Sequence, residues 1–446
     1  MEKELLYGSI LSDNRPPHID DAIIRINGNT DGIPTQLMLS DSILSKHMML
    51  IGGTGCGKTN TFFYLVEQTK HNMTDNDVMI IFDTKGDYYR KFYNSYTDHI
   101  ITTSSEEFPI INKWNVFREI LVDGIKREAI EANVHEIAWG LFSESITKNN
   151  SNPFFPNAAR DLFAAIMICL IRKTGNKPDL IEKYLDNEYL KNFFDSLTVN
   201  TLKSLFKDQY DQMSVMTYIG DGENTQGLGV LAELQTIVRK VFVGGFAEKG
   251  SFSIRELVRQ RKAKTLFIEY DLDRGSSLMP IYKMLIDLAL KESMGIEAKK
   301  RIKNGQKGNV YIFCDEFKLL PDLQHIEDAV NFGRSLGIKV FAGLQSIDQL
   351  VENYGDARAK NIIAGFSSVM SFRANDESTR QFTVGKYGKN YVLEQYISSI
   401  NNSMPEEKRL GNVVEDWEIC ALHIGEAIIG LPECEPFKFQ FEEYTR

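Results

Sequence analysis

The stretch GGTGCGKT, Gly52 to Thr59, constrains the fold of this 446-residue chain more than any other stretch. It fits the pattern G-x-x-x-x-G-K-[ST], follows the apolar, strand-like run His47–Ile51 and precedes an amphipathic helical pattern. In such a loop the glycines let consecutive backbone N–H groups turn inward around phosphate oxygens, and the helix N-terminus adds partial positive charge. The motif therefore predicts an α/β domain in which a phosphate-binding loop joins a strand to a helix.

The loop predicts binding of a nucleoside triphosphate, ATP, together with Mg²⁺. Lys58 is expected to reach the β- and γ-phosphates, and the Thr59 hydroxyl to ligate Mg²⁺. A dinucleotide-binding loop is excluded because G-x-G-x-x-G cannot be aligned here and the Lys-Thr pair would be unexplained. A glycine-rich turn without a ligand is the alternative. The residues expected to contact the nucleotide are Gly52, Gly53, Thr54, Gly55, Cys56, Gly57, Lys58, Thr59 and Asn60.

Short apolar runs alternate with helical stretches along most of the chain, which is typical of α/β units on a largely parallel sheet. Between about Phe117 and Val243 the pattern is helical throughout. We therefore expect residues 1–116 and 244–446 to form the two parts of an ATPase domain, and 117–243 an inserted all-α domain. The runs predicted as strands are His47–Ile51, Val78–Asp83, His99–Thr102, Lys264–Tyr270, Asn309–Asp315, Ile338–Leu344 and Phe366–Phe372.

The second half of the site is predicted at NVYIFCDEF, where an apolar run ends in Asp315 and Glu316. Carboxylates at the carboxyl edge of the sheet are expected near the bound phosphates. Asp315 would hold Mg²⁺ through water, and Glu316 would polarise the attacking water, which indicates a hydrolase rather than a small-molecule kinase. The alternative for Glu316 is capping of the following helix.

Another strand end, in VMIIFDTKGDYY, places Asp83 and Lys85 in a turn. Its apolar run directs the turn to the same carboxyl edge. Asp83 and Lys85 are therefore candidates for contact with the nucleotide or with a neighbouring subunit, and a solvated turn is an equal alternative.

The block GRSLGIKVFAGLQS predicts a buried strand with Arg334 before it and Gln345 after it. The Gln345 amide would emerge beside the γ-phosphate and orient the attacking water or sense the phosphate, and a polar strand end is the alternative. The strand separates its two ends by roughly 20 Å, so Arg334 is badly placed to reach its own nucleotide. Arg334 is a candidate arginine finger for a neighbouring subunit in a ring, or a helix-end cation, and Arg373 and Arg380 compete for the finger role.

Composition limits the possible classes of protein. The net charge of −10 argues against a protein that coats nucleic acid, although DNA in a locally basic channel is compatible with it. The basic runs Arg255–Lys264 and Lys299–Lys307 are candidates for phosphate contacts, with solvated loops as the alternative. Five scattered cysteines show no metal-ligand spacing and indicate reduced thiols in a cytosol.

The ends and apolar segments indicate no membrane anchor. The acidic N-terminus is unlike a signal peptide. The longest apolar stretch, Leu162–Ile171, is shorter than the ~20 residues that cross a bilayer. We therefore predict a cytoplasmic protein, with attachment to the inner membrane through a partner as an alternative.

Together these segments resemble type IV secretion coupling proteins, the conjugation ATPases of the HerA–FtsK superfamily. The resemblance runs from about His47 to Phe441 and is carried by the DTKGD turn, NPFFPNAARDL, IFCDEF, GRSLGIKVFAGLQSIDQL and NDESTRQFTVGKYG. The closing stretch, RLGNVVEDWEICALHIGEAIIGLPECEPFKFQF, is also similar to that family's C-terminal end. Many ATPases share the P-loop and the acid pair, whereas the block from Arg334 to Gln345 with its SIDQL tail is the most family-specific part.

The resemblance implies a RecA-like P-loop core with an all-α domain, assembled as a hexameric ring that hydrolyses ATP to move DNA. The DNA is usually a single strand bound to a relaxase and travels toward a secretion channel. The family usually carries N-terminal transmembrane helices that this sequence lacks, so we expect docking on a separate membrane subunit or work away from membranes. The residues implied in the roles above are Lys58, Thr59, Asp315, Glu316, Gln345 and Arg334.

Two other functions are compatible with the same residues. One is a cytoplasmic HerA–FtsK-like ATPase that acts in DNA processing or phage defence beside a nuclease. The other is an ATP-gated scaffold or protein-substrate receptor, in which hydrolysis sets assembly rather than motion. Stimulation of hydrolysis by DNA separates a motor from a scaffold.

Overall fold

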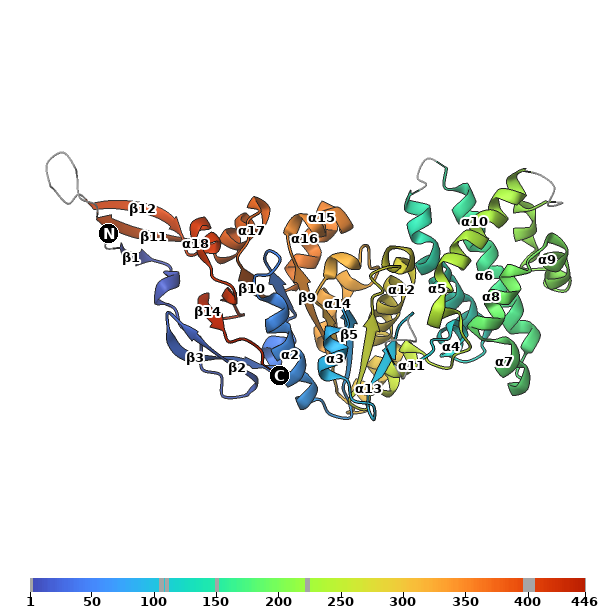
Figure 1. Ribbon diagram of the computed structural model, residues 1–446, viewed down its shortest axis with the longest axis horizontal. Helices are drawn as coiled ribbons and strands as arrows, with labels where there is room; N and C mark the ends of the chain where they lie inside the picture. The colour runs from blue at the N-terminus through green and yellow to red at the C-terminus, as the bar shows by residue number, and fades with distance from the viewer. Residues whose placement is uncertain are drawn as a thin grey trace. The chain divides into compact units, whose positions relative to one another are not determined.

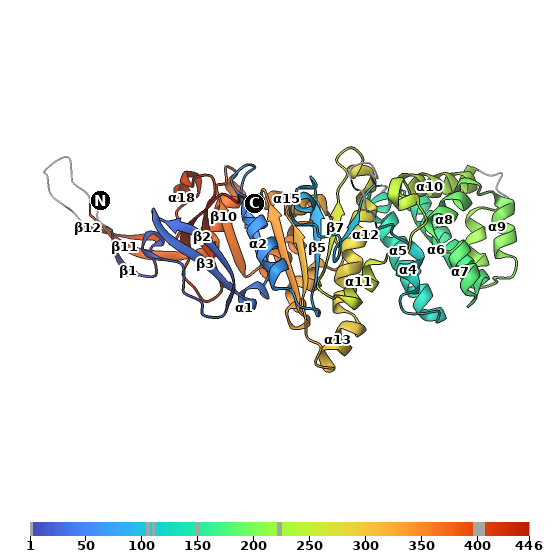
Figure 2. The ribbon, with the colours of Figure 1, turned by 60° about the horizontal axis from the view of Figure 1, so that its bottom comes forward.

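The computed structural model of the chain describes residues 3–103, 108, 112–148, 152–220, 225–395 and 406–445. They form two compact units, whose elements are labelled in Figures 1 and 2. The first unit comprises Met1–Phe82, Arg90–Phe92 and Lys299–Arg446, and the second comprises Asp83–Tyr89 and Tyr93–Ala298. The second unit is therefore an insertion into the sequence of the first.

A mixed β-sheet organises the first unit. Its parallel part has the spatial order β10-β4-β9-β8-β5, and an antiparallel part continues beyond β10 in the order β13-β14-β2-β3. The parallel strands are β4 (Met48–Ile51), β5 (Val78–Asp83), β8 (Val310–Cys314), β9 (Ile338–Leu344) and β10 (Ser368–Phe372). The antiparallel strands are β2 (Ala22–Thr30), β3 (Ile33–Ser40), β13 (Glu426–Gly430) and β14 (Phe437–Phe441).

The apolar runs of the sequence explain the parallel strands. Every residue of β4, β5, β8, β9 and β10 is buried, as expected for strands that are covered on both faces. The predicted strands begin and end within two residues of the observed ones. The buried Lys339 of β9 is an exception to the apolar pattern, and it pairs with Asp41 and lies 5.0 Å from the centre of the Tyr311 ring.

The first unit also contains the helices that connect these strands and a small, separate antiparallel sheet. The helices of the first unit are α1 (Asp41–Leu44), α2 (Lys58–Asn72), α14 (Ile326–Phe332), α15 (Ile347–Tyr354), α16 (Asp356–Gly365), α17 (Glu377–Tyr387) and α18 (Asp416–Ala421). The small sheet has the order β1-β11-β12, with bounds Lys3–Tyr7, Lys389–Gln395 and Glu406–Asn412. Helix α2 is the element that positions the phosphate-binding loop, because it begins at Lys58.

The second unit is mainly helical, and it also contains the parallel pair β6 (His99–Ile101) and β7 (Lys264–Glu269). Its helices are α4 (Val116–Leu121), α5 (Arg127–Lys148), α6 (Phe154–Thr174), α7 (Pro178–Tyr184), α8 (Asn187–Asp195), α9 (Val199–Phe206), α10 (Thr225–Val241), α11 (Ile254–Gln260) and α12 (Gly275–Met294). Two more helices, α3 (Asp87–Phe92) and α13 (Ile296–Lys303), cross the unit boundaries.

Helix α6 is longer than the apolar stretch Leu162–Ile171 that it contains. Among the described residues it is the one helix that is long and apolar enough to cross a membrane, and 72% of its apolar window is buried in the protein. Its packing against α5 and α10 accounts for this apolar sequence without a bilayer.

Candidate nucleotide site

The phosphate-binding loop joins β4 to α2, and its backbone requires glycine at two points. Gly52 has a φ of 153°, and a Cβ added to it would lie 2.7 Å from the Cβ of Phe372. Gly57 has a φ of 111°, and an added Cβ would lie 2.8 Å from the Cα of Gly425. A side chain at either position would therefore clash with its surroundings and strain the loop.

Backbone hydrogen bonds hold this loop from two sides and leave its tip open. The N–H of Gly53 donates to the carbonyl of Arg373 (2.8 Å), and the N–H of Gly425 donates to that of Cys56 (2.9 Å). Within the described part of the chain, no carbonyl oxygen accepts a hydrogen bond from the N–H groups of Thr54, Gly55, Gly57 or Thr59. Free N–H donors at the N-terminus of a 15-residue helix fit a polyphosphate anion.

Lys58 is buried, and its ammonium group lies against the loop rather than in solvent. Nζ donates to the carbonyl oxygens of Gly52 (2.7 Å) and Gly53 (2.9 Å). Both acceptors are neutral, so a charged phosphate oxygen in the loop would compete for the same donors with a stronger hydrogen bond. The contact of Lys58 with the β- and γ-phosphates stays a prediction.

Thr59 and Asp315 meet at the start of α2. The hydroxyl Oγ1 of Thr59 lies 2.7 Å from Oδ2 of Asp315, which follows β8 and is buried. A hydroxyl and a carboxylate side by side fit a Mg²⁺ ion that takes its remaining ligands from phosphate and water. No group of three or more His, Cys, Asp or Glu side chains forms a metal site among the described residues, so the protein alone offers no closed cage.

Glu316 and Gln345 face one another across the ends of β8 and β9. Nε2 of Gln345 lies 3.2 Å from Oε1 and 3.0 Å from Oε2 of Glu316. Glu316 precedes the short 3₁₀ helix Phe317–Leu319 and makes no capping hydrogen bond to it, so the capping alternative is not observed. A carboxylate and an amide that both remain half-buried at this edge are able to bind and orient a water molecule.

The strand register places Gln345 and Arg373 on opposite sides of the loop. In the parallel sheet, Ile51 of β4 is level with Leu344 of β9 and with Ser371 of β10. Gln345, one residue beyond Leu344, and Arg373, two residues beyond Ser371, therefore lie on either side of the start of the phosphate-binding loop.

The three candidate arginines occupy different places. The guanidinium group of Arg380 is paired with Asp416 through Nε (2.9 Å), so Arg380 is engaged within its own subunit. Arg334 lies in the 3₁₀ helix Gly333–Leu336 before β9, at the end of that strand opposite Gln345, and is exposed. Burial and the nearby Arg334 charge lower the pKa of His47 to about 4, which places Arg334 beside a neutral imidazole.

Asp83 closes its own turn. Its carboxylate accepts hydrogen bonds from the N–H groups of Tyr89 (2.9 Å) and Lys85 (3.4 Å). Burial raises the pKa of Asp83 to about 6, and the solvated-turn alternative is wrong for this residue because it is fully buried. Lys85 is exposed.

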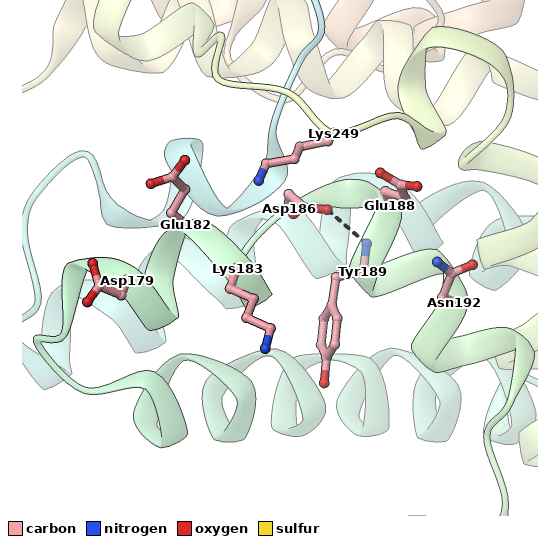
Figure 3. A pocket seen from close by; sticks show the side chains of 8 residues that line it. All are labelled: Asp179, Glu182, Lys183, Asp186, Glu188, Tyr189, Asn192 and Lys249. Carbon is pink, nitrogen blue, oxygen red and sulfur yellow. Dashed lines mark hydrogen bonds between the residues drawn. The ribbon is translucent and has the colours of Figure 1, made fainter.

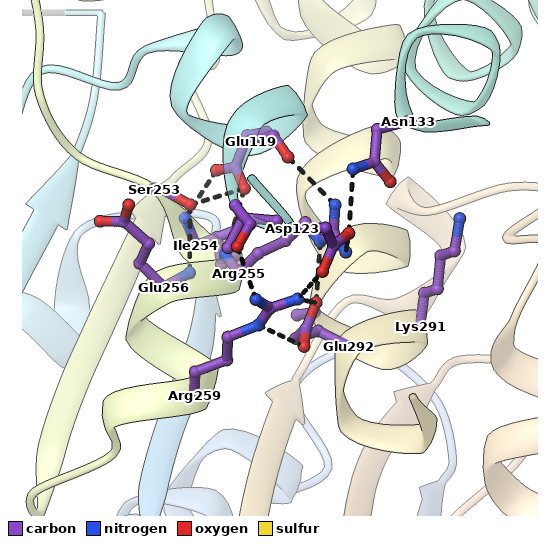
Figure 4. A network of polar contacts seen from close by, with 12 residues as sticks. Glu119, Asp123, Asn133, Ser253, Ile254, Arg255, Glu256, Arg259, Lys291 and Glu292 are labelled. Atoms are coloured by element: carbon purple, nitrogen blue, oxygen red, sulfur yellow. Dashed lines mark hydrogen bonds and ion pairs between the residues drawn. The ribbon is translucent and has the colours of Figure 1, made fainter. Parts of the chain in front are cut away.

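The first basic run, Arg255–Lys264, does not form a surface patch. Both interpretations of this run from the sequence, phosphate contacts and a solvated loop, are therefore wrong for much of it. Arg255 and Arg261 are buried, and Arg255 binds Glu292 (2.8 Å) and Asp123 (2.9 Å) in a network that also includes Arg259 (Figure 4). The reason is that α11 turns Arg255 and Arg259 toward Glu292 of α12 and Asp123, which follows α4. The second run differs, since Lys299, Lys303 and Lys307 are exposed.

A surface cavity of about 510 Å³ lies in the second unit, around α7 and α8 (Figure 3). Its wall carries more carboxylates than ammonium groups, and Asp186 accepts a hydrogen bond from the N–H of Tyr189 (2.8 Å). Such a lining repels a phosphate backbone. The charged residues are Asp179, Glu182, Lys183, Asp186, Glu188 and Lys249.

The C-terminal segment lies beside the phosphate-binding loop, which the sequence did not indicate. The Asn60 side chain donates to the carbonyl of Glu442 (2.8 Å) and accepts from the N–H of Tyr444 (2.7 Å). The Asn60 side chain is therefore engaged with the C-terminal segment, and its contact with the nucleotide stays a prediction. The turn at Gly425, which packs on the loop, is a second feature without a local sequence signal.

Comparisons with known proteins found a matching family model, two coupling proteins and similar solved structures. Residues 33–436 match the family model of the type IV secretion-system coupling protein DNA-binding domain. The coupling protein TraD of Escherichia coli (strain K12) is 22% identical over 409 residues, which cover 89% of this chain and 51% of TraD. The type IV secretion system-coupling protein VirD4 of Bartonella henselae is 22% identical over 292 residues, which cover 60% of this chain and 42% of VirD4. The chain thus spans about half the length of these relatives or less.

The fold is similar to that of the bacterial conjugative coupling protein TrwB. Unbound TrwBdeltaN70 superposes with a TM-score of 0.72 at 20% identity, covering 99% of this chain and 94% of that chain. TrwB in complex with the non-hydrolysable ATP analogue ADPNP gives a TM-score of 0.70 at 19% identity, covering 99% and 95%. The predicted fold class, a RecA-like α/β P-loop domain with a further helical part, is thereby confirmed.

Proposed function

Because the chain belongs to the type IV secretion-system coupling protein family, we propose that it is an ATP-hydrolysing subunit of a ring-shaped motor that binds and moves DNA. The description of the family model, a DNA-binding domain of coupling proteins, supports the DNA part of the proposal. TrwB has been solved with ADPNP and with ADP and Mg²⁺, and the loop geometry of this chain fits the same ligands.

The observation that carries the proposal is the contact of Thr59 with Asp315 beside the Glu316–Gln345 pair. Together with Lys58, these side chains surround the place where the γ-phosphate of ATP would lie. Mg²⁺ would be held by Thr59 and, through water, by Asp315, and would neutralise phosphate charge. In this arrangement the phosphoryl group is transferred to water rather than to a second substrate, because the edge of the sheet presents a carboxylate that can activate water.

Glu316 is the base in the proposed reaction. It accepts a proton from a water molecule whose oxygen attacks the γ-phosphorus, while the bond to the leaving oxygen of ADP breaks. Gln345 donates to Glu316 and thereby restrains the carboxylate until the γ-phosphate competes for the same amide. Lys58 stabilises the charge on the β- and γ-oxygens.

Arg334 completes the site in trans in this proposal. It stands at the amino end of β9, whereas its own phosphate-binding loop is level with the carboxyl end of the same strand. An exposed arginine that cannot reach its own nucleotide suits the nucleotide of a neighbouring subunit, as in a homohexameric ring.

The proposed substrate is single-stranded or relaxase-bound DNA, and the proposed place of action is the cytoplasmic side of a secretion channel. The second basic run, Lys299–Lys307, has exposed lysines and remains a candidate for contacts with DNA phosphates. A relaxase is the expected cargo partner.

The test is ATP hydrolysis with and without DNA, measured together with particle mass. We expect DNA to stimulate hydrolysis and nucleotide to favour a closed ring. Glu316→Gln is expected to bind ATP without hydrolysing it, and Lys58→Ala to lose binding of the triphosphate. Hydrolysis that is indifferent to every single- and double-stranded DNA tested would sink the motor and favour an ATP-gated scaffold.

A further inference from the structure

Arg373 lies closer to its own phosphate-binding loop than its position in the sequence suggests. It directly follows β10, which pairs in parallel with β4, and its carbonyl accepts the hydrogen bond from Gly53 (2.8 Å). A Cβ added to Gly52 would lie 3.1 Å from the same carbonyl oxygen. The main chain of Arg373 therefore forms one wall of the loop.

The side chain of Arg373 is half-buried, and none of the ion pairs formed by the described residues involves it. In contrast, Arg380, only seven residues away, is paired with Asp416. A guanidinium group keeps its charge at every physiological pH, and one that makes no ion pair with a described residue is available to bind an anion. The anion that belongs at this loop is the polyphosphate.

The strand register gives Arg373 a counterpart. Gln345 leaves β9 on one side of β4, and Arg373 leaves β10 on the other side. Gln345 and Arg373 thus follow the two strands that neighbour β4, one on each side of the loop. Both belong to the same subunit as Lys58, whereas Arg334 lies at the opposite end of β9.

From this placement we propose that Arg373 binds the γ-phosphate of the ATP held by its own subunit, so that it acts in cis and makes the site prefer ATP over ADP. The inference rests on the proposed ATPase function. Arg373 and Arg334 were both candidates for the arginine finger in the sequence. The proposal gives them different roles, with Arg373 acting in cis and Arg334 in trans. The guanidinium group offers several N–H donors in a fixed plane, which suits the oxygens of a terminal phosphate.

Binding of ADPNP and ADP by dilute, unassembled subunits tests the proposal directly. For Arg373→Gln, which keeps a polar stem but no charge, we expect ADPNP affinity to fall about 10- to 100-fold and ADP affinity to fall less than about threefold. Arg373→Lys should recover part of the preference. An unchanged ratio of the two affinities would overturn the proposal, provided that thermal unfolding shows a folded variant.

The wild-type chain separates this proposal from the proposed function. If the wild type binds neither nucleotide, the ATPase proposal itself fails. If it binds and hydrolyses ATP while Arg373→Gln keeps the wild-type preference, only the role of Arg373 fails.

Mixed assemblies distinguish cis from trans action. Subunits with Lys58→Ala mixed with Arg334→Ala subunits should regain hydrolysis, because a normal loop can meet a normal finger. Subunits with Lys58→Ala mixed with Arg373→Gln subunits should not exceed the activity of Arg373→Gln subunits alone, because each normal loop then lacks its own arginine. Recovery in the second mixture would place Arg373 in trans and overturn the proposal. If neither mixture recovers, the ratio of the two affinities decides.

Discussion

Replacing Gln345 with glutamate puts a second negative charge where the structure holds a neutral donor. The amide nitrogen of Gln345 lies 3.0 Å from Oε2 of Glu316, so the two carboxylates of the Gln345→Glu variant would lie almost in contact. At about 4 Å, like charges repel by about 4 kcal/mol in an effective dielectric constant of about 20. Water around these half-buried side chains reduces the repulsion to about 2 kcal/mol, which corresponds to about 1.5 pKa units. One shared proton relieves this repulsion, so the pair will stay protonated to a higher pH than a single carboxylate.

The assay for this prediction is the pH dependence of kcat for ATP hydrolysis in Gln345→Glu and Gln345→Met. Methionine has a similar volume but no charge and no donor, so it separates the loss of the amide from the gain of the carboxylate. We expect the activity of Gln345→Glu to rise about 1.5 pH units later than that of Gln345→Met, with ATP binding retained in both. Superimposable profiles would refute the reasoning, because Glu316 would then not face residue 345 during turnover.

Three further predictions concern the two units. Folded Asp83 holds its proton to about pH 6, while the unfolded chain releases it near 3.8, so stability falls as the pH rises between these values. The wild type should lose roughly 2.5 kcal/mol more than Asp83→Asn between about pH 4 and pH 7, measured by urea unfolding; parallel curves would contradict this. Arg255→Met takes one of its two arginine partners from the buried Glu292 and should cost about 3–5 kcal/mol, against about 0.5 kcal/mol or less for Lys191→Met, whose pair with Asp195 is partly exposed. Equal costs in the same urea assay would mean that water enters the buried network. Gly57→Ala should cost about 1–3 kcal/mol in unfolding free energy and weaken ATP binding, because its φ is 111°.

The parallel part of the sheet was predictable because buried strands read as continuous apolar runs, and runs such as Val78–Asp83 carry that signal in their own residues. The antiparallel part was not predicted, although β2 alternates between buried and exposed residues and a turn at Asp31-Gly32 joins it to β3. The alternation and the turn are a local signal of a hairpin, but continuous apolar runs, which indicate parallel units, do not include it. In contrast, the pairing of β14 with β2 joins residues about 400 positions apart and has no local signal.

Charged residues were less predictable than strands because a charge is visible in the sequence and its partner is not. Arg255 looked like part of a basic patch, but its acid partner Glu292 lies 37 residues away on another helix. Arg373 and Arg380 looked equivalent as candidate fingers, and the acid that pairs with Arg380 lies 36 residues away. The register of β10 against β4 makes the distinction, since it sets the carbonyl of Arg373 on the N–H of Gly53. Whether an arginine serves its own ATP or a neighbour's therefore depends on which end of which strand carries it, and that is a property of the sheet rather than of the motif.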